Sequence, residues 1–132
     1  MRTVRSRIWL ATGVALAVVA LLAMAAIGSM AKSRVREVSL VARGMAFYAD
    51  GTSKANPILH ARPGERLRIT VVNSAPGMVH DLAIDAVSAS TPPLTAGQAA
   101  SIEFTAPETP GDYTYRCRPH ALMMKGVLTV AE

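Results

Sequence analysis

The chain has 132 residues, of which 51% are hydrophobic and 17% are charged, and it contains one cysteine. This composition excludes a long disordered polymer, and the single cysteine excludes an internal disulfide framework, a cysteine-rich zinc module and a paired-cysteine redox site. Lys and Arg outnumber Asp and Glu by 14 to 9, but Arg2, Arg5 and Arg7 precede a long apolar run, and the rest of the chain holds 11 against 9. No block of basic residues follows, so nucleic-acid binding is not expected.

The N-terminal segment has the layout of an export signal, with a basic start followed by 24 uncharged residues, Ile8–Ala31. About 20 apolar residues are enough for a helix to span a bilayer, which favours a helix retained as an anchor in the inner (cytoplasmic) membrane. The alternative is cleavage near Ala31 followed by secretion, because Ser29-Met30-Ala31 offers the small residues that a signal peptidase requires. Either outcome places the rest of the chain outside the cytoplasm, in the periplasm. The predicted organisation is an anchor or signal peptide over 1–31, a tether over 32–37 and one domain over 38–132.

After the tether, apolar residues recur at every second position in short runs, which is typical of half-buried β-strands. Turn sequences rich in Gly and Pro separate these runs, for example Arg62-Pro63-Gly64-Glu65 and Thr109-Pro110-Gly111-Asp112. No amphipathic helix is evident after Ala31. The pattern predicts an all-β sandwich or barrel. The alternating runs are Val38–Ala42, Leu67–Val71, Ile102–Phe104, Tyr113–Cys117 and Leu128–Val130.

A thiol, an imidazole and a thioether lie within eight residues, at Cys117, His120 and Met124, between the last two predicted strands. A further histidine, His80, follows the turn Ala75-Pro76-Gly77. Two histidines, one cysteine and a weakly bound methionine are the ligand set of mononuclear blue-copper electron-transfer sites. Structural zinc fits less well because it prefers four strong ligands. His60 precedes a turn and is expected at the surface.

The same stretch resembles the cupredoxins, the blue-copper proteins that include plastocyanin, amicyanin and azurin. The resemblance extends over Val38–Val130, and Cys117-Arg-Pro-His120 matches the family's Cys-x-Pro-His loop. The turn before Arg66, followed by Asn73 and His80, matches the region that supplies the first histidine. The resemblance implies a Greek-key β-sandwich and one copper ion cycling between Cu(I) and Cu(II). It also implies that His80, Cys117 and His120 are copper ligands, together with one methionine.

Two counts give different axial methionines. Counting forward from His120 as in the amicyanin loop selects Met123, whereas counting back from the last strand selects Met124, through the family pattern Met-x-Gly-x-apolar-x-apolar. A shift of one residue in strand register would turn every side chain to the wrong face, so we favour Met124. The sequence departs from the family at Asp81, where Asn or Ser is usual. We expect Asp81 to accept backbone N–H bonds near Cys117, or to pair with Arg116 or Arg118.

The function that the resemblance implies is single-electron transfer rather than catalysis, by a monomer whose partners are redox proteins such as a cytochrome or a membrane oxidase or reductase. A periplasmic copper-binding protein for copper resistance or delivery is the alternative. A Cys–His nucleophilic enzyme is disfavoured, because Cys117 and His120 lie three residues apart in one loop with no orienting group. We expect His120 to reach the surface as the electron exit. The surrounding apolar contact patch is expected to comprise Ala75, Pro76, Met78, Ala121, Leu122 and Met123.

Overall fold

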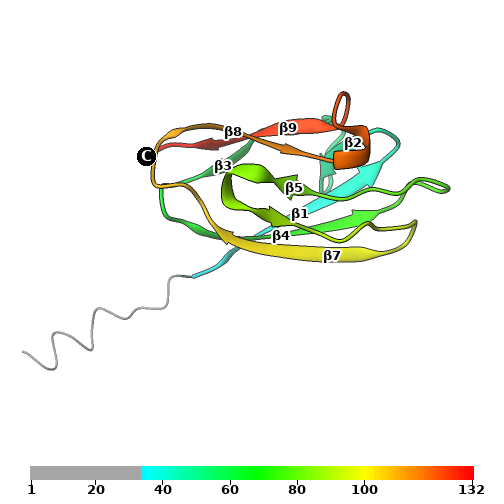
Figure 1. Ribbon diagram of the computed structural model, residues 1–132, viewed down its shortest axis with the longest axis horizontal. Helices are drawn as coiled ribbons and strands as arrows, with labels where there is room; N and C mark the ends of the chain where they lie inside the picture. The colour runs from blue at the N-terminus through cyan, green and yellow to red at the C-terminus, as the bar shows by residue number, and fades with distance from the viewer. Residues whose placement is uncertain (1–33) are drawn as a thin grey trace, which may run out of the picture. The chain divides into compact units, whose positions relative to one another are not determined.

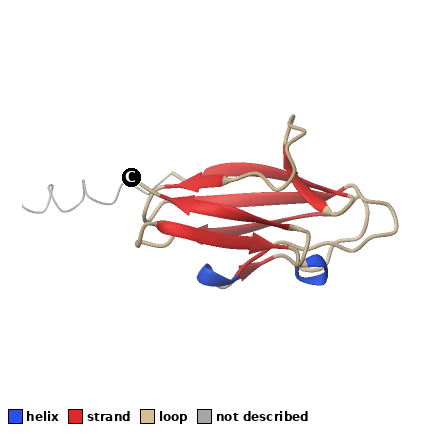
Figure 2. Cartoon of the chain, turned by 90° about the horizontal axis from the view of Figure 1, so that it is seen from above, coloured by secondary structure: helices blue, strands red, loops and turns tan. Residues whose placement is uncertain are grey.

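The computed structural model describes residues 34–132, which form two β-sheets packed face to face. The first sheet contains β1 (Arg36–Arg43), β2 (Ala46–Ala49), β4 (Arg66–Asn73) and β7 (Ala99–Thr105). The second sheet contains β3 (Leu59–Ala61), β5 (Ala83–Ile84), β6 (Ala89–Ser90), β8 (Gly111–Arg116) and β9 (Lys125–Val130). Two 3₁₀ turns, η1 (Asp85–Val87) and η2 (Arg118–His120), are drawn in blue in Figure 2.

The strand order is β2-β1-β4-β7 in one sheet and β3-β9-β8-β5-β6 in the other. β1 runs parallel to β4 and β3 runs parallel to β9, while the other neighbouring pairs are antiparallel. The predicted all-β sandwich is therefore confirmed. The anchor or signal helix predicted for residues 8–31 lies outside the described residues. Within residues 34–132, no helix combines the length and the apolar character that a membrane span requires.

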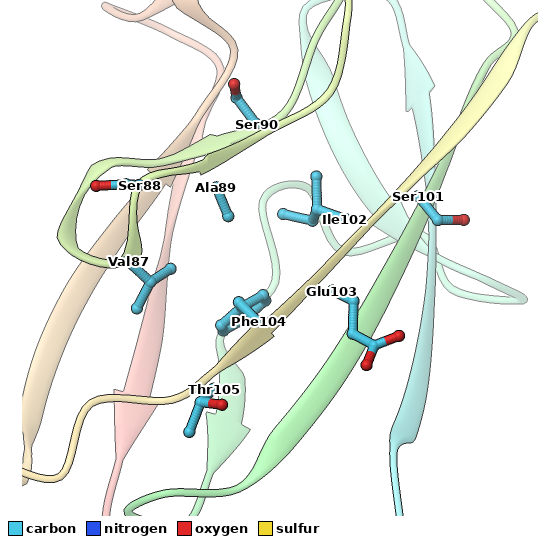
Figure 3. A pocket seen from close by; sticks show the side chains of 9 residues that line it. All are labelled: Val87, Ser88, Ala89, Ser90, Ser101, Ile102, Glu103, Phe104 and Thr105. Carbon is cyan, nitrogen blue, oxygen red and sulfur yellow. The ribbon is translucent and has the colours of Figure 1, made fainter.

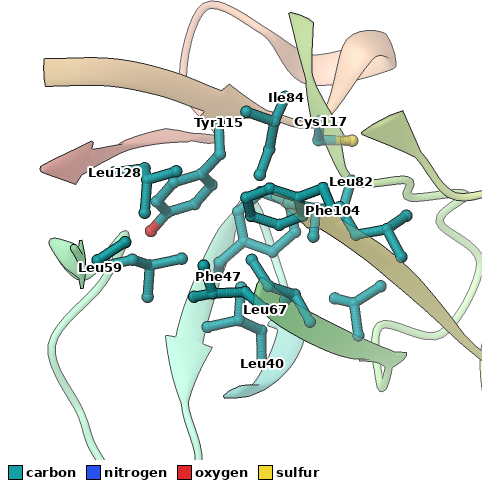
Figure 4. Packing of buried hydrophobic residues seen from close by; sticks show 14 of the residues in the cluster. Leu40, Phe47, Leu59, Leu67, Leu82, Ile84, Phe104, Tyr115, Cys117 and Leu128 are labelled. Carbon is teal, nitrogen blue, oxygen red and sulfur yellow. The ribbon is translucent and has the colours of Figure 1, made fainter. Parts of the chain in front are cut away.

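The inner faces of the two sheets form one core, and the alternating runs of the sequence supply part of it (Figure 4). On β4, Leu67, Ile69 and Val71 are buried while the residues between them are more exposed, as the period of two predicts. Each fully buried side chain of this size stabilises the fold by about 1.5–3 kcal/mol. Phe47 and Tyr115 meet edge to face at the centre, with ring centroids 5.6 Å apart.

One close approach in the second sheet requires a glycine. Gly126 of β9 lies opposite Tyr115 of β8, and a Cβ atom at position 126 would lie 2.3 Å from the Tyr115 ring and hydroxyl. The Tyr115 hydroxyl donates a hydrogen bond of 2.5 Å to the carbonyl of Pro57, which holds the ring in place. The glycine therefore lets the ring cross β9 at the last but one residue pair of the β8–β9 ladder before Cys117.

A hollow of about 600 Å³ opens between β6 and β7, the edge strands of the two sheets. Figure 3 shows Ile102 and Phe104 extending from β7 toward Val87 and Ala89, whereas Glu103 points to the other side. Glu103 forms ion pairs across the outer face of the first sheet, so it is not directed into this hollow. The hollow contains none of the predicted metal ligands.

The two ends of the sandwich have different roles. β1 begins beside Leu67 and ends beside Asn73, so the chain enters the domain at the end where the C-terminus also lies (Figure 1). At the opposite end, β8 and β9 are joined by the loop Cys117–Met124, which we call the ligand loop. β4 also ends there, at Asn73. This topology gathers the predicted metal ligands at one end.

Candidate metal centre

Three side chains from two distant parts of the chain meet at this end of the sandwich. The Cys117 Sγ lies 3.6 Å from Nδ1 of His80 and 3.5 Å from Nδ1 of His120. One ligand atom from each residue lies within 4.8 Å of the others, and the two imidazole rings are tilted by 59° with centroids 5.0 Å apart. Cys117 and His80 are buried, and His120 is half-buried. Among residues 34–132, these three side chains form a cluster that could hold a metal ion.

The spacing of these atoms fits one transition-metal ion. Thiolate and imidazole ligands bind such an ion at about 2.0–2.3 Å, which separates the sulfur from each nitrogen by about 3.5–3.8 Å. Both Nδ1 atoms face the sulfur, as a shared ion requires. A soft thiolate with two imidazoles selects copper over hard cations such as Mg²⁺ or Ca²⁺. The donor set and the distances therefore both suit copper.

Burial favours the uncharged forms of His80 and Cys117 in the absence of metal. Desolvation lowers the pKa of His80, and the neighbouring His120 lowers it further. Desolvation also raises the pKa of Cys117, although backbone N–H groups of Asp81 and His120 oppose this rise. A neutral imidazole is the form that binds metal, whereas the thiol must lose its proton. Metal binding therefore displaces a proton from Cys117.

Asn73 holds the segment that carries His80. Its buried amide donates to the carbonyls of Met78 at 2.9 Å and Leu94 at 2.8 Å, and its Oδ1 accepts the N–H of Ala75 at 2.9 Å. Leu94 and His80 also exchange two backbone hydrogen bonds. The Nε2 of His80 is buried, and no described residue accepts from it in hydrogen-bond geometry, although the Gly44 carbonyl lies nearby. The His80 ring is thus held with Nδ1 toward the sulfur.

The ligand loop is a tight turn with one buried and one exposed methionine. The carbonyl of His120 accepts the N–H groups of Met123 and Met124, and the Met124 carbonyl accepts the N–H of Cys117 at 2.9 Å. The Met124 side chain is fully buried in the core cluster that includes Cys117, whereas Met123 is 63% exposed. Burial therefore favours Met124 as the axial ligand, and this assignment remains a prediction.

Asp81 makes both kinds of contact that the sequence suggested. Its Oδ1 accepts the backbone N–H of Arg118 at 2.7 Å, and its Oδ2 accepts from Nε of the same residue at 2.5 Å. Arg116, the other expected partner, pairs with Asp85 instead at 2.6 Å. Arg116 is the last residue of β8, and its side chain points to the outer face, toward η1.

Asn56 supports the site in a way that was not predicted from the sequence. It adopts a left-handed backbone conformation with φ of 49°, which asparagine tolerates better than most residues. Its Oδ1 accepts the N–H of Phe47 at 3.0 Å, and its Nδ2 donates to the Met123 carbonyl at 3.2 Å. Asn56 therefore ties the ligand loop to β2. The dipeptide Asn56-Pro57, a frequent turn signal, was the available clue.

The surface next to His120 is apolar. Leu122 is 92% exposed, and a shallow hollow of about 210 Å³ lies beside it. Ala75 was expected in this surface, but it is buried because its N–H bonds to Asn73 and the residue turns inward. The prediction was wrong for Ala75. The hollow is lined by Met45, Pro119, His120, Ala121, Leu122 and Met123.

Comparisons with known proteins agree with this geometry. The sequence model of the copper-binding proteins of the plastocyanin/azurin family matches residues 66–131. No curated protein sequence matches the chain. Among solved structures, auracyanin B is similar with 26% identity and a TM-score of 0.57, over 74% of this chain and 88% of that one.

Two further structures are similar in fold. Rusticyanin from Thiobacillus ferrooxidans has 23% identity and a TM-score of 0.57, over 74% of this chain and 77% of that one. A copper-containing nitrite reductase from Thermus scotoductus SA-01 has the same identity and TM-score, but the match covers only 28% of the enzyme. The family match and the His80–Cys117–His120 arrangement identify copper as the cofactor.

Proposed function

Because this chain belongs to the plastocyanin/azurin family of copper-binding proteins, we propose that it carries single electrons between redox proteins outside the cytoplasm. The observation that carries this proposal is the convergence of Cys117, His80 and His120. The Nδ1 atoms of the two histidines lie 3.5–3.6 Å from the Cys117 sulfur. Bound copper supplies a one-electron couple between Cu(I) and Cu(II). The protein binds the ion, orients its ligands and presents one ligand to redox partners.

The protein's contribution is to hold the ligands rigidly. Asn73 fixes the His80 segment with hydrogen bonds to Ala75, Met78 and the paired residue Leu94, and the Cys117–Met124 backbone bond closes the ligand loop. A site whose ligands are held in place changes little between oxidation states, so little reorganisation accompanies electron transfer. Met124, buried beside Cys117, is our proposed axial ligand and a determinant of the potential.

We propose that partners dock on the apolar surface beside His120, because His120 is the ligand that lies closest to the exterior. His120 is half-buried, and the exposed side chains of Leu122 and Met123 surround it. A small apolar contact without fixed ion pairs suits brief encounters with a cytochrome or a membrane oxidase or reductase. We propose that residues 8–31 keep the protein at the inner membrane. β1, the first strand of the described domain, begins at the end of the sandwich remote from His120.

We propose that the chain is a carrier and not an enzyme. The nitrite reductases that share the fold are much longer chains. The match covers 28% of one such enzyme and 41% of another. The metal-binding group of the described residues is a single set of three ligands, suited to holding one copper ion. We also propose that it acts as a monomer.

Copper delivery or resistance is the second candidate, because the thioether of Met123 and the ring of His120 lie at the surface, where copper could be exchanged. Voltammetry of the copper-loaded chain, combined with competition against a Cu(I) chelator, separates the two. Electron transfer predicts a fast reversible couple and slow copper loss. A sluggish couple with rapid release of Cu(I) to the chelator would favour delivery and contradict our proposal.

A further inference from the structure

A buried carboxylate joins the two chain segments that supply the metal ligands. Asp81 follows His80 directly, and Arg118 follows Cys117 directly. The Asp81 carboxylate accepts both the backbone N–H and the Nε–H of Arg118, at 2.7 and 2.5 Å. The Asp81 side chain is only 3% exposed, so these contacts replace hydration. One side chain therefore fixes the position of Cys117 relative to His80.

The Arg118 guanidinium has a second partner besides Asp81. Its Nη2 donates to the carbonyl of Thr91 at 3.3 Å, and the Thr91 hydroxyl accepts the N–H of Leu82 at 3.0 Å. Arg118 itself remains 47% exposed. The guanidinium thus spans from the ligand loop to the strand pair that follows His80. Since a buried carboxylate without its counter-charge is strongly unfavourable, the two residues depend on each other.

We propose that Asp81 and Arg118 form a positioning pair that locks Cys117 against His80 and sets the reduction potential of the copper site. The buried negative charge of Asp81 favours the more positive Cu(II), and the guanidinium of Arg118 offsets that effect. The buried charge of Asp81 acts more strongly on the metal than a solvated charge does, and Arg118 acts mainly as its counter-charge. This inference rests on the proposed function, because the potential matters only for a redox role.

The chain offers a matched control on the other side of Cys117. Arg116 also neighbours the cysteine in sequence and forms an ion pair of 2.6 Å with Asp85. These side chains are 38% and 66% exposed, and Asp85 is not adjacent to a ligand. Solvent and salt screen such a pair effectively. Neutralising either partner changes the net charge by the same amount as at Asp81 or Arg118.

The test measures the reduction potential and the visible spectrum of the copper-loaded full chain at high ionic strength. Arg118→Gln is expected to lower the potential, because Asp81 loses its counter-charge. Asp81→Asn is expected to raise it, because the positive charge of Arg118 is then unopposed, while the amide oxygen can still accept the Arg118 N–H. The double variant is expected to return close to the original potential. Arg116→Gln and Asp85→Asn are expected to give shifts several-fold smaller.

Positioning is read separately, from denaturant unfolding of the metal-free chain. Each single variant at Asp81 or Arg118 is expected to lower stability, and the double variant is expected to cost less than the sum. Potential shifts of the same sign, or no larger than those of the Arg116 and Asp85 controls, would overturn the proposal. Additive stability losses would overturn it too. If Arg118→Gln does not fold, Asp81→Asn decides alone: a raised potential supports the pair, and an unchanged potential refutes it.

Failure of this inference is distinguishable from failure of the proposed function. An unmodified chain that binds copper without a reversible couple would contradict electron transfer before any variant is compared. A reversible couple that the Asp81 and Arg118 variants leave unmoved would contradict only the role of the pair.

Discussion

Replacing Gly126 with alanine is expected to destabilise the domain by about 1–3 kcal/mol, because the new methyl group overlaps the ring of Tyr115. The added carbon would lie 2.3 Å from Cζ and Oη and 2.6 Å from Cε1 of that ring. Favourable contacts between carbon atoms lie at about 3.5–4.0 Å, so the ring or β9 must move by more than 1 Å.

Overpacking sets the magnitude, because the two smaller contributions to the free energy of unfolding nearly offset each other. Overpacking a filled core costs about 1–3 kcal/mol. Moving the ring also weakens the hydrogen bond from Tyr115 to the Pro57 carbonyl, at a cost of about 0.5–1.5 kcal/mol. Against these, alanine restricts the unfolded chain and returns about 0.4–1 kcal/mol. The backbone at Gly126 does not have a positive φ, so the loss is steric and not conformational.

Denaturant unfolding of the metal-free chain measures the loss, and a Tyr115→Leu background supplies the control. With the ring removed, Gly126→Ala is expected to cost less than about 0.5 kcal/mol, within the range of a substitution that meets no overlap. Only the Arg116–Lys125 pair separates the Tyr115–Gly126 pair from the Cys117–Met124 hydrogen bond, so the copper-loaded variant is expected to show an altered visible spectrum. An equal loss in both backgrounds would refute the steric argument.

Three further predictions concern the site and its support. Asn73→Leu is expected to cost about 2–4 kcal/mol in unfolding experiments, because the buried Leu94 carbonyl and the partly buried Met78 carbonyl lose their donor; a loss below 1 kcal/mol would contradict this. Met124→Leu is expected to raise the reduction potential by removing a donor to the oxidised ion, whereas Met123→Leu is expected to leave it nearly unchanged, and equal shifts would contradict the assignment. Hydrogen bonding to Arg68 lowers the pKa of Glu103 below its ordinary 4.5, so Glu103 stabilises the fold above that pH and the contribution is lost as the pH falls through the lowered pKa. Acid unfolding followed by circular dichroism is expected to show a weaker pH dependence in Glu103→Gln, and an unchanged curve would contradict it.

The long strands were predictable because their burial is one-sided. Leu67, Ile69 and Val71 alternate over enough residues for the period to be read. β5 and β6 have two residues each, which is too short for any period, and they were missed. β5 is placed by pairing with β8, a long-range contact that no local pattern encodes, and β6 is placed by pairing with β5.

The close sequence spacing of Cys117, His120 and Met124 made the ligand loop visible. The sequence did not predict whether Arg116 or Arg118 pairs with Asp81. It depends on Arg116 ending β8 on the outer face, whereas Arg118 lies within η2 beside Asp81. Ala75 was misplaced for a similar reason: a small apolar residue beside a proline fits either a surface or a core position, and its bond to Asn73 decides.

The absorption and electron-spin-resonance spectra of the copper-loaded chain test the central claim most directly. Direct bonding of the Cys117 sulfur to copper held by His80 and His120 predicts an intense blue band from thiolate-to-copper charge transfer. Cys117→Ser is expected to abolish that band. A colourless copper complex, or a band that survives the loss of the cysteine, would contradict the assignment of this site.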